Sequence, residues 1–334
     1  MQNNSAPFGG AKWLWLNGHA IRWDAATTNI SDHALHYGTG VFEGIRCYET
    51  PEGPAVFRLD AHLNRLFASA EAYDMRIPFS KESLADAVCT LIHQNCLENC
   101  YIRVLCWLGT HDLGITSGKW PVQTAILAWP WRALFADQPA ETGIRVTIAP
   151  WRKIHWSMLP TTAKASGQYL SSLLCTQSAK RRGYDEALLL DASGNLAEGS
   201  AENIFLIKNN RLLTNDENSS ILLGITRDSV IDIARDLGIE VEVRALTIEE
   251  LFDADYAFFT GTAAEIVRVR EVDGKQIGAV GEHPLAQDIR TCFQDITAGR
   301  SRQFPGWITH IEETHSLVPV TGSYGNAGRR STAQ

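Results

Sequence analysis

The sequence predicts an α/β protein of two domains, and three observations support this fold class. The chain has 334 residues, enough for two domains that each bury a core. Segments with the period of a β-strand recur among segments with the period of an amphipathic helix. A polar segment that contains Pro139 separates two groups of such patterns. We therefore expect domains at 1–129 and 143–310, an interdomain loop at 130–142 and a loose tail at 311–334.

The first half is expected to begin with a β-hairpin. Apolar residues flank Asn17-Gly18, a pair typical of a tight hairpin turn. The spacing of apolar residues further predicts helices over 58–73 and 84–97 and strands over 101–108 and 122–129. Arg103 lies inside the third of these segments, where a buried charge needs a partner. We expect this arginine either to reach solvent or to bind an anion.

The second half carries a longer series of elements. Strands are expected over 145–149, 186–190, 212–214 and 256–259, and helices over 169–181, 226–238 and 284–297. Thr226 is the expected N-cap of its helix, whose unpaired N–H groups could bind a phosphate. An ordinary capped helix without a ligand fits the same residues.

The composition excludes several classes of function. A net charge of −8 and a pI near 5.7 argue against a nucleic-acid-binding surface and against an anionic membrane surface. The first residues lack a signal-peptide pattern, and no apolar run approaches the length of a membrane span. The seven cysteines include no C-x-x-C pair, which indicates reduced thiols in a cytoplasmic protein. The ten histidines form no metal-binding motif, so we expect no metal.

Lys164 stands in an unusual segment, because it lies among small residues with a tyrosine five positions later. We expect the flanking apolar residues to be buried, namely Trp156, Leu159, Leu170, Leu173 and Leu174. Burial would lower the pKa of the ammonium group, and a neutral amine can form a Schiff base. A surface lysine at the edge of a loop is the alternative. Of the eight lysines, Lys153 is a distant second candidate.

An amine that reacts with an aldehyde cofactor would need three further groups. A phosphate would need an anion site, for which the helix start at Thr226 and the turn at Gly261-Thr262 are candidates. A pyridine nitrogen would need a carboxylate to hold its proton, and Glu198 is a candidate. A ring hydroxyl would need a hydrogen-bond partner, which Tyr169 could provide.

The segment from Glu198 to Arg227 resembles a known family signature. The run Glu198-Gly199-Ser200-Ala201-Glu202-Asn203-Ile204-Phe205, followed by Leu212-x-Thr214 and Leu222-x-Gly224-Ile225-x-Arg227, is similar to that of the fold-type IV pyridoxal-phosphate enzymes. The strings His36-Tyr37-Gly38, Val41-Phe42-Glu43-Gly44-Ile45-Arg46, Tyr101-Ile102-Arg103, Thr162-Ala163-Lys164-Ala165 and Gly261-Thr262-Ala263-Ala264-Glu265 resemble the branched-chain amino-acid aminotransferases. The resemblance implies two α/β domains, the second a pseudo-barrel, assembled at least as a homodimer.

The resemblance also implies a role for each matched residue. Pyridoxal 5′-phosphate would be bound by Lys164 as the catalytic residue, Glu198 at the ring nitrogen, Tyr169 at the ring oxygen, Leu222 on the ring face, and Arg65, Ile225, Thr226 and Thr262 around the phosphate. The carboxylate of the substrate would be bound by Tyr101, Thr262 and Ala263. Its side chain would contact Tyr37, Phe42, Trp131 and the partner subunit's Leu113. Arg103 would bind the distal carboxylate of glutamate, and Arg46 would also lie in the substrate site. Two departures bear on substrate range: Val104 stands where the family usually has proline, and residues 110–115 match the family loop poorly.

The resemblance implies a transaminase that moves amino groups between leucine, isoleucine or valine and 2-oxoglutarate, giving glutamate. A D-amino-acid or (R)-amine transaminase on the same fold is one alternative. An aminodeoxychorismate-type lyase, which shares the cofactor site, is another. A non-catalytic protein that binds vitamin B6, with Lys164 in a structural role, is the alternative from outside the enzymes. All four of these functions require small-molecule ligands, and none requires binding to nucleic acid or to a membrane.

Overall fold

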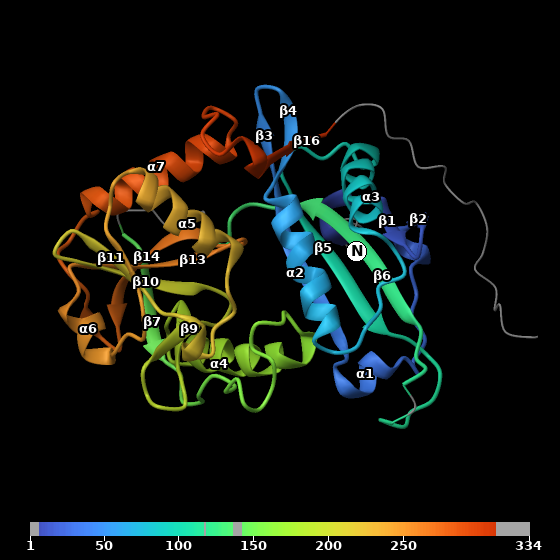
Figure 1. The fold of residues 1–334 in the computed structure, drawn as a ribbon, viewed down its shortest axis with the longest axis horizontal. Helices are drawn as coiled ribbons and strands as arrows, with labels where there is room; N and C mark the ends of the chain where they lie inside the picture. The colour runs from blue at the N-terminus through green and yellow to red at the C-terminus, as the bar shows by residue number, and fades with distance from the viewer. Residues whose placement is uncertain (1–6, 117, 136–141, 312–334) are drawn as a thin grey trace, which may run out of the picture.

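The structure, a computed structural model, describes residues 7–116, 118–135 and 142–311. Figure 1 shows two lobes side by side, each with its own sheet and helices. The first lobe carries β1 to β6 and the last strand, β16, and the second carries the elements from β7 to α7. The two-domain α/β fold that the sequence predicts is therefore confirmed.

The first lobe is built on a seven-stranded sheet of order β16-β4-β3-β5-β6-β1-β2, in which all neighbours are antiparallel. Its strands are β1 (Trp13–Leu16), β2 (His19–Arg22), β3 (Gly40–Thr50), β4 (Gly53–Phe57), β5 (Cys100–Leu108), β6 (Val122–Pro130) and β16 (Ile308–His310). The helices of this lobe are α1 (His33–Tyr37), α2 (Leu59–Glu71) and α3 (Lys81–Gln94). Apolar side chains of α2 and α3 form one buried core with β3 and β5. The hairpin at Asn17-Gly18 forms as expected, with positive φ at both residues.

The second lobe is built on a sheet that closes on itself. Its main strands are β7 (Ile144–Ile148), β8 (Glu186–Leu190), β9 (Leu196–Gly199), β10 (Asn203–Lys208), β13 (Tyr256–Gly261) and β14 (Glu265–Val272). They pair in the order β10-β13-β14-β7-β8-β9, and β9 also pairs with β10, which closes a six-stranded barrel. Further strands are β11 (Arg211–Thr214), β12 (Val241–Val243) and β15 (Lys275–Gln276). The predicted pseudo-barrel is thus present.

Helices α4 (Tyr169–Arg181), α5 (Ile225–Asp236), α6 (Ile248–Asp253) and α7 (Pro284–Thr297) surround the barrel. Short 3₁₀ turns occur at Pro7–Gly10, Trp23–Ala25, Ser166–Gln168, Glu217–Ser219 and Pro305–Trp307. Side chains of α5 and α7 share a core with the outer face of β10 and β13. The start of α5 and the ends of β9 and β13 lie on the side of the second lobe that faces the first, where they meet one cavity with Arg65 of α2.

Two sequence-based expectations about this lobe are wrong. The apolar residues Leu170, Leu173 and Leu174 of α4 are 63%, 52% and 42% exposed, because α4 packs on β8 through Ser172, Cys175 and Ala179 instead. Trp156 and Leu159 are also exposed rather than buried. An apolar helix stripe shows only that a face avoids water, and in a single chain this face remains uncovered.

The start of α5 also differs from the prediction. Its N-cap is Gly224, and Thr226 lies one residue inside the first turn, where it is buried. A β-carbon at Gly224 would lie only 2.0 Å from Asn203 Oδ1, so the close approach of Asn203 requires glycine there. The helix therefore still presents unpaired N–H groups at Ile225 and Thr226, but without a side-chain cap.

The domain boundaries stay a prediction. The last described strand, β16, lies within the range expected for the second domain but pairs with β4 of the first lobe. Residues 136–141 of the expected interdomain loop and 312–334 of the expected tail lie outside the described residues. Within the described part of the chain, no helix is both long enough and apolar enough to cross a membrane.

Candidate active site

A cavity lies between the lobes, and the predicted cofactor residues line it. Arg65 reaches it from α2 of the first lobe, and the other residues come from the second lobe. Its lining includes Arg65, Lys153, Lys164, Tyr169, Glu198, Leu222, Ile225, Thr226 and Thr262. The fold therefore brings together all eight residues that the sequence predicts for the cofactor.

Lys164 is fixed to the first lobe through its backbone. Its N–H donates to Ser69 Oγ (2.9 Å), and its carbonyl accepts from the N–H of Phe42 (3.0 Å). Its Nζ donates to the Tyr169 hydroxyl at 2.7 Å. Burial, and then the charge of Arg65, lower the pKa of Lys164 to about 8. A substantial fraction of this amine is therefore neutral in mildly alkaline solution.

Tyr169 is the first residue of α4 and faces the same cavity. Burial raises the pKa of Tyr169 to about 12, so the phenol stays protonated at neutral pH. Its ring lies edge-on to that of Phe42, with the centroids 4.8 Å apart. The hydroxyl accepts a hydrogen bond from Lys164 and keeps its own proton to donate to another acceptor.

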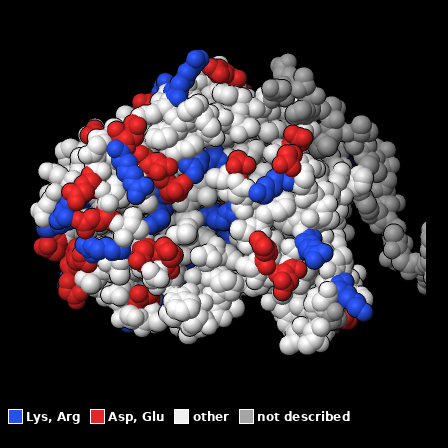
Figure 2. Space-filling view, in the orientation of Figure 1, with Lys and Arg blue, Asp and Glu red and all other residues white. Residues whose placement is uncertain are grey.

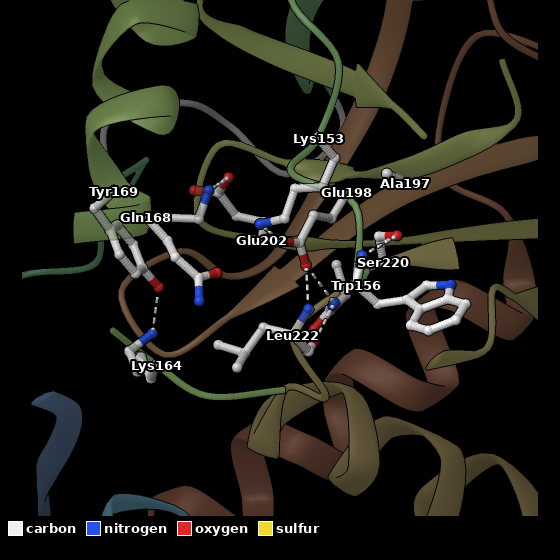
Figure 3. Close-up of polar contacts among 12 residues, drawn as sticks. Lys153, Trp156, Lys164, Gln168, Tyr169, Ala197, Glu198, Glu202, Ser220 and Leu222 are labelled. Carbon is white, nitrogen blue, oxygen red and sulfur yellow. Dashed lines mark hydrogen bonds and ion pairs between the residues drawn. The ribbon is translucent and has the colours of Figure 1, made fainter. Parts of the chain in front are cut away.

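Glu198, on β9, is held by three donors (Figure 3). Its Oε2 accepts from the N–H of Leu222 (3.0 Å) and from Asn203 Nδ2 (3.2 Å), and its Oε1 forms an ion pair with Lys153 Nζ. The carboxyl is buried, with a side chain that is 6% exposed. The ion pair with Lys153 and the two further donors fix the orientation of this acidic side chain, which lies on a different wall of the cavity from Arg65.

The anion-binding features gather around Arg65 and the start of α5. Arg65 Nη1 donates to the carbonyl of Leu223 at 2.8 Å, next to the N-terminus of that helix. The Thr260 hydroxyl lines this cavity, is buried, and has no hydrogen-bond partner among the described residues. An arginine, a helix N-terminus and an unpartnered hydroxyl group make a site that suits a phosphate.

Arg65 is itself held in place by Glu43 of β3. The guanidinium donates through Nε to Oε1 (2.6 Å) and through Nη2 to Oε2 (2.9 Å), and His62 Nδ1 lies 2.7 Å from the same Oε2. Burial opposes the charge on Glu43, but Arg65 and His62 outweigh it and hold the pKa of this carboxyl well below its usual range. Burial also lowers the pKa of His62, so its neutral ring can serve as an N–H donor.

A second cavity, of about 640 Å³, adjoins the first and shares Lys164, Tyr169 and Thr262 with it. Its lining also includes Phe42, Tyr101, Arg103, Trp129, Trp131 and Ala263. Arg103 lies over the ring of Phe42, 4.5 Å from the centroid, and the ring centroids of Tyr101 and Trp131 are 5.6 Å apart. Arg103 Nε and Trp131 Nε1 are buried without a hydrogen-bond partner in the described residues. The cavity therefore combines apolar aromatic walls with the cation of Arg103.

Gly44 explains how Tyr101 enters this cavity. A β-carbon at Gly44 would lie 1.8 Å from the Tyr101 hydroxyl, so the tyrosine crosses β3 where no side chain stands. The two residues lie on neighbouring strands, and Gly44 pairs with Arg103 in register. The glycine in the Phe42-Glu43-Gly44 string thus has a packing role that no spacing in the sequence reveals.

Three predicted substrate residues do not line either cavity. Tyr37 is half exposed and donates to the carbonyl of Leu113 at 2.7 Å, and Leu113 is 47% exposed. Arg46 is buried, with Nη1 3.5 Å from Glu265 and its guanidinium 4.9 Å from the Tyr48 ring centroid. Arg46 thus links β3 of the first lobe to the start of β14 in the second. The roles of Tyr37, Leu113 and Arg46 in the substrate site stay predictions.

Four residues hold the predicted site residues in place, and none of them is expected in that role from the sequence: Glu43, His62, Lys153 and Asn203. Glu43 and His62 carried a usable signal, because Glu43 follows Phe42 by one residue and His62 precedes Arg65 by one helical turn. Lys153 and Asn203 carried none, because their contacts with Glu198 depend on how β9 and the segment after β7 meet in the barrel. Glu202 is also buried beside them, and burial, followed by Glu186, raises its pKa to about 8.

Comparisons with known proteins agree with this geometry. Residues 40–272 match the family model for amino-transferase class IV. A branched-chain-amino-acid aminotransferase of Pseudomonas aeruginosa is 39% identical over 299 residues, which cover 90% of this chain and 97% of that protein. One from Escherichia coli K12 is 40% identical over 304 residues, covering 91% and 98%.

Solved structures give the same result. The crystal structure of the Escherichia coli branched-chain amino acid aminotransferase has a TM-score of 0.88 at 40% identity and covers 90% of this chain and 100% of that one. The T.th. branched-chain amino acid aminotransferase with pyridoxamine 5′-phosphate has a TM-score of 0.87 at 40% identity, covering 90% and 99%. The same T.th. enzyme is also known in complex with N-(5′-phosphopyridoxyl)-L-glutamate and with 4-methylvaleric acid. The chain belongs to the class IV aminotransferases and, within them, to the branched-chain amino-acid aminotransferase family of fold type IV.

Proposed function

We propose that this protein transfers amino groups between branched-chain L-amino acids and 2-oxoglutarate, with pyridoxal 5′-phosphate as its cofactor. The observation that carries the proposal is the arrangement of Lys164, Tyr169 and Glu198 around one cavity. An amine with a lowered pKa lies 2.7 Å from a neutral phenol, and a buried carboxyl group that is paired with Lys153 lies on another wall. These are the groups that a pyridoxal cofactor needs at its aldehyde, its ring oxygen and its ring nitrogen.

The described residues also fit the rest of that cofactor. The unpartnered Thr260 hydroxyl, the guanidinium of Arg65 and the start of α5 all line the cavity. Arg65, the N–H groups of Ile225 and Thr226, and Thr262 would hold the phosphate, and Leu222 would pack on a ring face. When bound, the cofactor supplies an aldehyde for an amine and a ring that withdraws electrons from the substrate Cα.

The side chains of this chain would then move and hold protons. Tyr169 would donate a hydrogen bond to the ring oxygen, and Glu198 would accept a hydrogen bond from the protonated ring nitrogen and so keep that proton in place. The Lys164 amine, once a substrate amine has taken its place, would take the proton from the substrate Cα and return it to the cofactor carbon beside it. Its lowered pKa suits this work, because a general base acts best when its pKa lies near the working pH.

The second cavity supports the choice of substrates. Tyr101 and the turn at Thr262-Ala263 would bind the carboxylate that every amino acid shares. Phe42 and Trp131 would contact a branched alkyl side chain, and Arg103 would pair with the distal carboxylate of glutamate. The complexes of the T.th. relative with a glutamate adduct and with 4-methylvaleric acid agree with a site that accepts both kinds of side chain.

We further propose that the working form is a homodimer or a higher assembly. Leu170, Leu173 and Leu174 of α4, together with Trp156 and Met158, leave an apolar surface exposed in the single chain. Figure 2 shows few charged side chains along the lower edge of the molecule, where Figure 1 places α4 and α1. A second copy would cover such a surface and would bring the partner subunit's Leu113 to the substrate cavity.

We also propose a cytoplasmic location. All seven cysteines lie among the described residues, and none of them forms a disulfide. Five of these cysteines are buried, which is how unreactive structural thiols usually occur. Unpaired cysteines in this number favour a reducing compartment.

A comparison of amino donors tests the proposed function. Purified protein loaded with pyridoxal 5′-phosphate is given 2-oxoglutarate with L-leucine, D-alanine or (R)-phenylethylamine, and glutamate formation is measured. We expect glutamate from L-leucine only, and a Lys164→Ala variant should form none. Preference for D-alanine or the (R)-amine, or release of pyruvate from an aminodeoxychorismate-type substrate without an acceptor, would contradict the proposal.

A further inference from the structure

A second lysine, Lys153, reaches the cavity and has no part in the roles given so far. It lies in the segment between β7 and Lys164, and its N–H donates to the carbonyl of Leu190 at the end of β8 (2.8 Å). Its side chain is 13% exposed and ends in an ion pair with Glu198 Oε1. Figure 3 shows the Lys153 side chain reaching Glu198 on the side away from Leu222. The lysine is therefore built into the carboxylate's surroundings.

The two lysines of the cavity are in opposite electrostatic situations. Burial lowers the pKa of Lys164, and the positive charge of Arg65 lowers it further. Burial also disfavours charge on Lys153, but Glu198 outweighs it, so the pKa of Lys153 is raised. Lys153 is therefore a permanent cation at neutral pH and no competitor for the aldehyde of a cofactor.

The groups that face Lys153 come from two elements. Glu198 lies on β9, and Tyr169 and Cys175 lie on α4. Among the described residues, Glu198 is the ion-pair partner of this lysine. Glu198 Oε1 receives the ammonium, whereas Oε2 receives Asn203 Nδ2 and the N–H of Leu222. Of the three donors that hold this carboxylate, the lysine is thus the charged one.

We propose that Lys153 is a positioning residue that keeps Glu198 ionised and fixes its orientation toward the ring nitrogen of the cofactor. This inference rests on the proposed function, because it assumes that Glu198 faces a pyridine ring. A buried carboxyl held only by the neutral donors Asn203 and Leu222 would gain a proton more readily. A protonated Glu198 could no longer pair with a protonated ring nitrogen, and it would hold the cofactor less firmly. In this proposal, the positive charge of Lys153 opposes the protonation of Glu198 at mildly acidic pH.

The pH dependence of cofactor binding tests this role directly. Apoprotein of the wild type and of Lys153→Met is titrated with pyridoxal 5′-phosphate between pH 5 and 8, and the dissociation constant is read from the cofactor's absorbance. We expect binding by Lys153→Met to weaken at a pH higher by on the order of one unit than in the wild type. Lys153→Arg, which keeps the charge, should restore the wild-type curve. Lys208→Met, which removes an ion-paired lysine outside the cavity, should leave the curve unchanged.

A double-mutant cycle separates this role from a general effect of charge or packing. In a Glu198→Gln background the carboxyl is absent, so Lys153→Met should no longer move the pH dependence. A shift of equal size in both backgrounds would overturn the proposal, because Lys153 would then act without Glu198. Curves of Lys153→Met and wild type that coincide would also overturn it.

Chemical modification gives a second readout that does not require Lys153→Met to fold. Apoprotein is treated with an acetylating reagent near pH 8, and the modified lysines are identified by mass spectrometry. Lys153 should be protected in the wild type and at least tenfold more reactive in Glu198→Gln, while Lys208 is modified alike in both. Equal reactivity of Lys153 in the two proteins would contradict the pairing. Failure of L-leucine as a donor would refute the proposed function but leave both of these results unaffected.

Discussion

The amine of Lys164 lies 2.7 Å from the hydroxyl of Tyr169, although the two side chains belong to different structural elements. Tyr169 begins α4, whereas Lys164 is tied to the first lobe through Ser69 and Phe42. The contact therefore lies where the Lys164 backbone meets the first lobe, at the point where chemistry is expected. It also places the neutral hydroxyl of Tyr169 next to the Lys164 amine, whose pKa is lowered in the site.

The lowered pKa of Lys164 predicts how stability depends on pH. The folded state releases this proton near pH 8, whereas the unfolded chain keeps it up to about 10.5. The unfolded state thus binds more protons in that interval, and the free energy of unfolding should rise with pH across it. Lys164→Met apoprotein should be more stable than the wild type at pH 7, by on the order of 2 kcal/mol.

Denaturant unfolding at several pH values measures this difference. We expect the advantage of Lys164→Met to shrink as the pH rises from 8 to 10.5 in both apoproteins. Lys12→Met, at an exposed position, is the matched control and should show no such trend. An advantage that is constant with pH would mean that the charge of Lys164 is not the cause.

Glu43→Gln should weaken both the fold and the phosphate site. The substitution leaves the Arg65 charge buried without its carboxylate, which typically costs about 3–5 kcal/mol. Arg65 would also lose its orientation, so binding of pyridoxal 5′-phosphate should weaken by tenfold or more. Thermal unfolding and cofactor titration measure the two effects. Glu49→Gln, an exposed change on the same strand, is the control, and an equal response of both variants would refute the assignment.

Arg103→Leu should separate the two halves of the reaction. Arg103 lies over the Phe42 ring in the substrate cavity, where it is the expected partner of a distal carboxylate. The KM for 2-oxoglutarate should rise by about tenfold to a hundredfold, since a charged hydrogen bond contributes roughly 1.5–3 kcal/mol. The half-reaction with L-leucine should change little. If leucine and 2-oxoglutarate suffer alike, Arg103 is not a selective carboxylate partner.

Gly44→Ala should displace Tyr101 from the substrate cavity. The new methyl group would overlap the tyrosine hydroxyl, which would lie 1.8 Å away. We expect a higher KM for all amino-acid donors, because Tyr101 is the proposed partner of their shared carboxylate. Gly44→Ala combined with Tyr101→Phe removes the hydroxyl but leaves the ring carbon Cζ 2.7 Å from the new methyl group, so it should recover only part of the stability and none of the affinity. Wild-type affinity in Gly44→Ala would show that Tyr101 does not touch the substrate.

The elements of this fold could largely be predicted from the sequence. Strong apolar periodicity predicts α2, α7 and the strands β5, β6 and β8, and the turn chemistry of Asn17-Gly18 predicts the first hairpin. The start of α5 was placed wrongly, because threonine is a common N-cap and the close approach of Asn203 to Gly224 is a tertiary contact. The exposure of the apolar face of α4 could not be predicted, because a sequence shows that a face avoids water but not what covers it.

The cofactor residues were found through short motifs, whereas the groups that hold them were not. Lys164 and Glu198 stand in recognisable strings, and the cavity unites them. The Glu43–Arg65 pair and the Lys153–Glu198 pair join segments that are distant along the chain, and an ion pair of this kind leaves no periodic signal. Arg46 was expected at the substrate and instead contacts Glu265, so its role there stays a prediction.

The most direct test of the account is a single-turnover experiment on the purified protein loaded with pyridoxal 5′-phosphate. L-Leucine is added without any keto acid, and the visible absorbance of the cofactor on Lys164 is followed. We predict that the absorbance is lost as one equivalent of the leucine keto acid forms, and that 2-oxoglutarate restores it. An absorbance that stays unchanged with L-leucine, or that responds to D-alanine instead, would contradict the account.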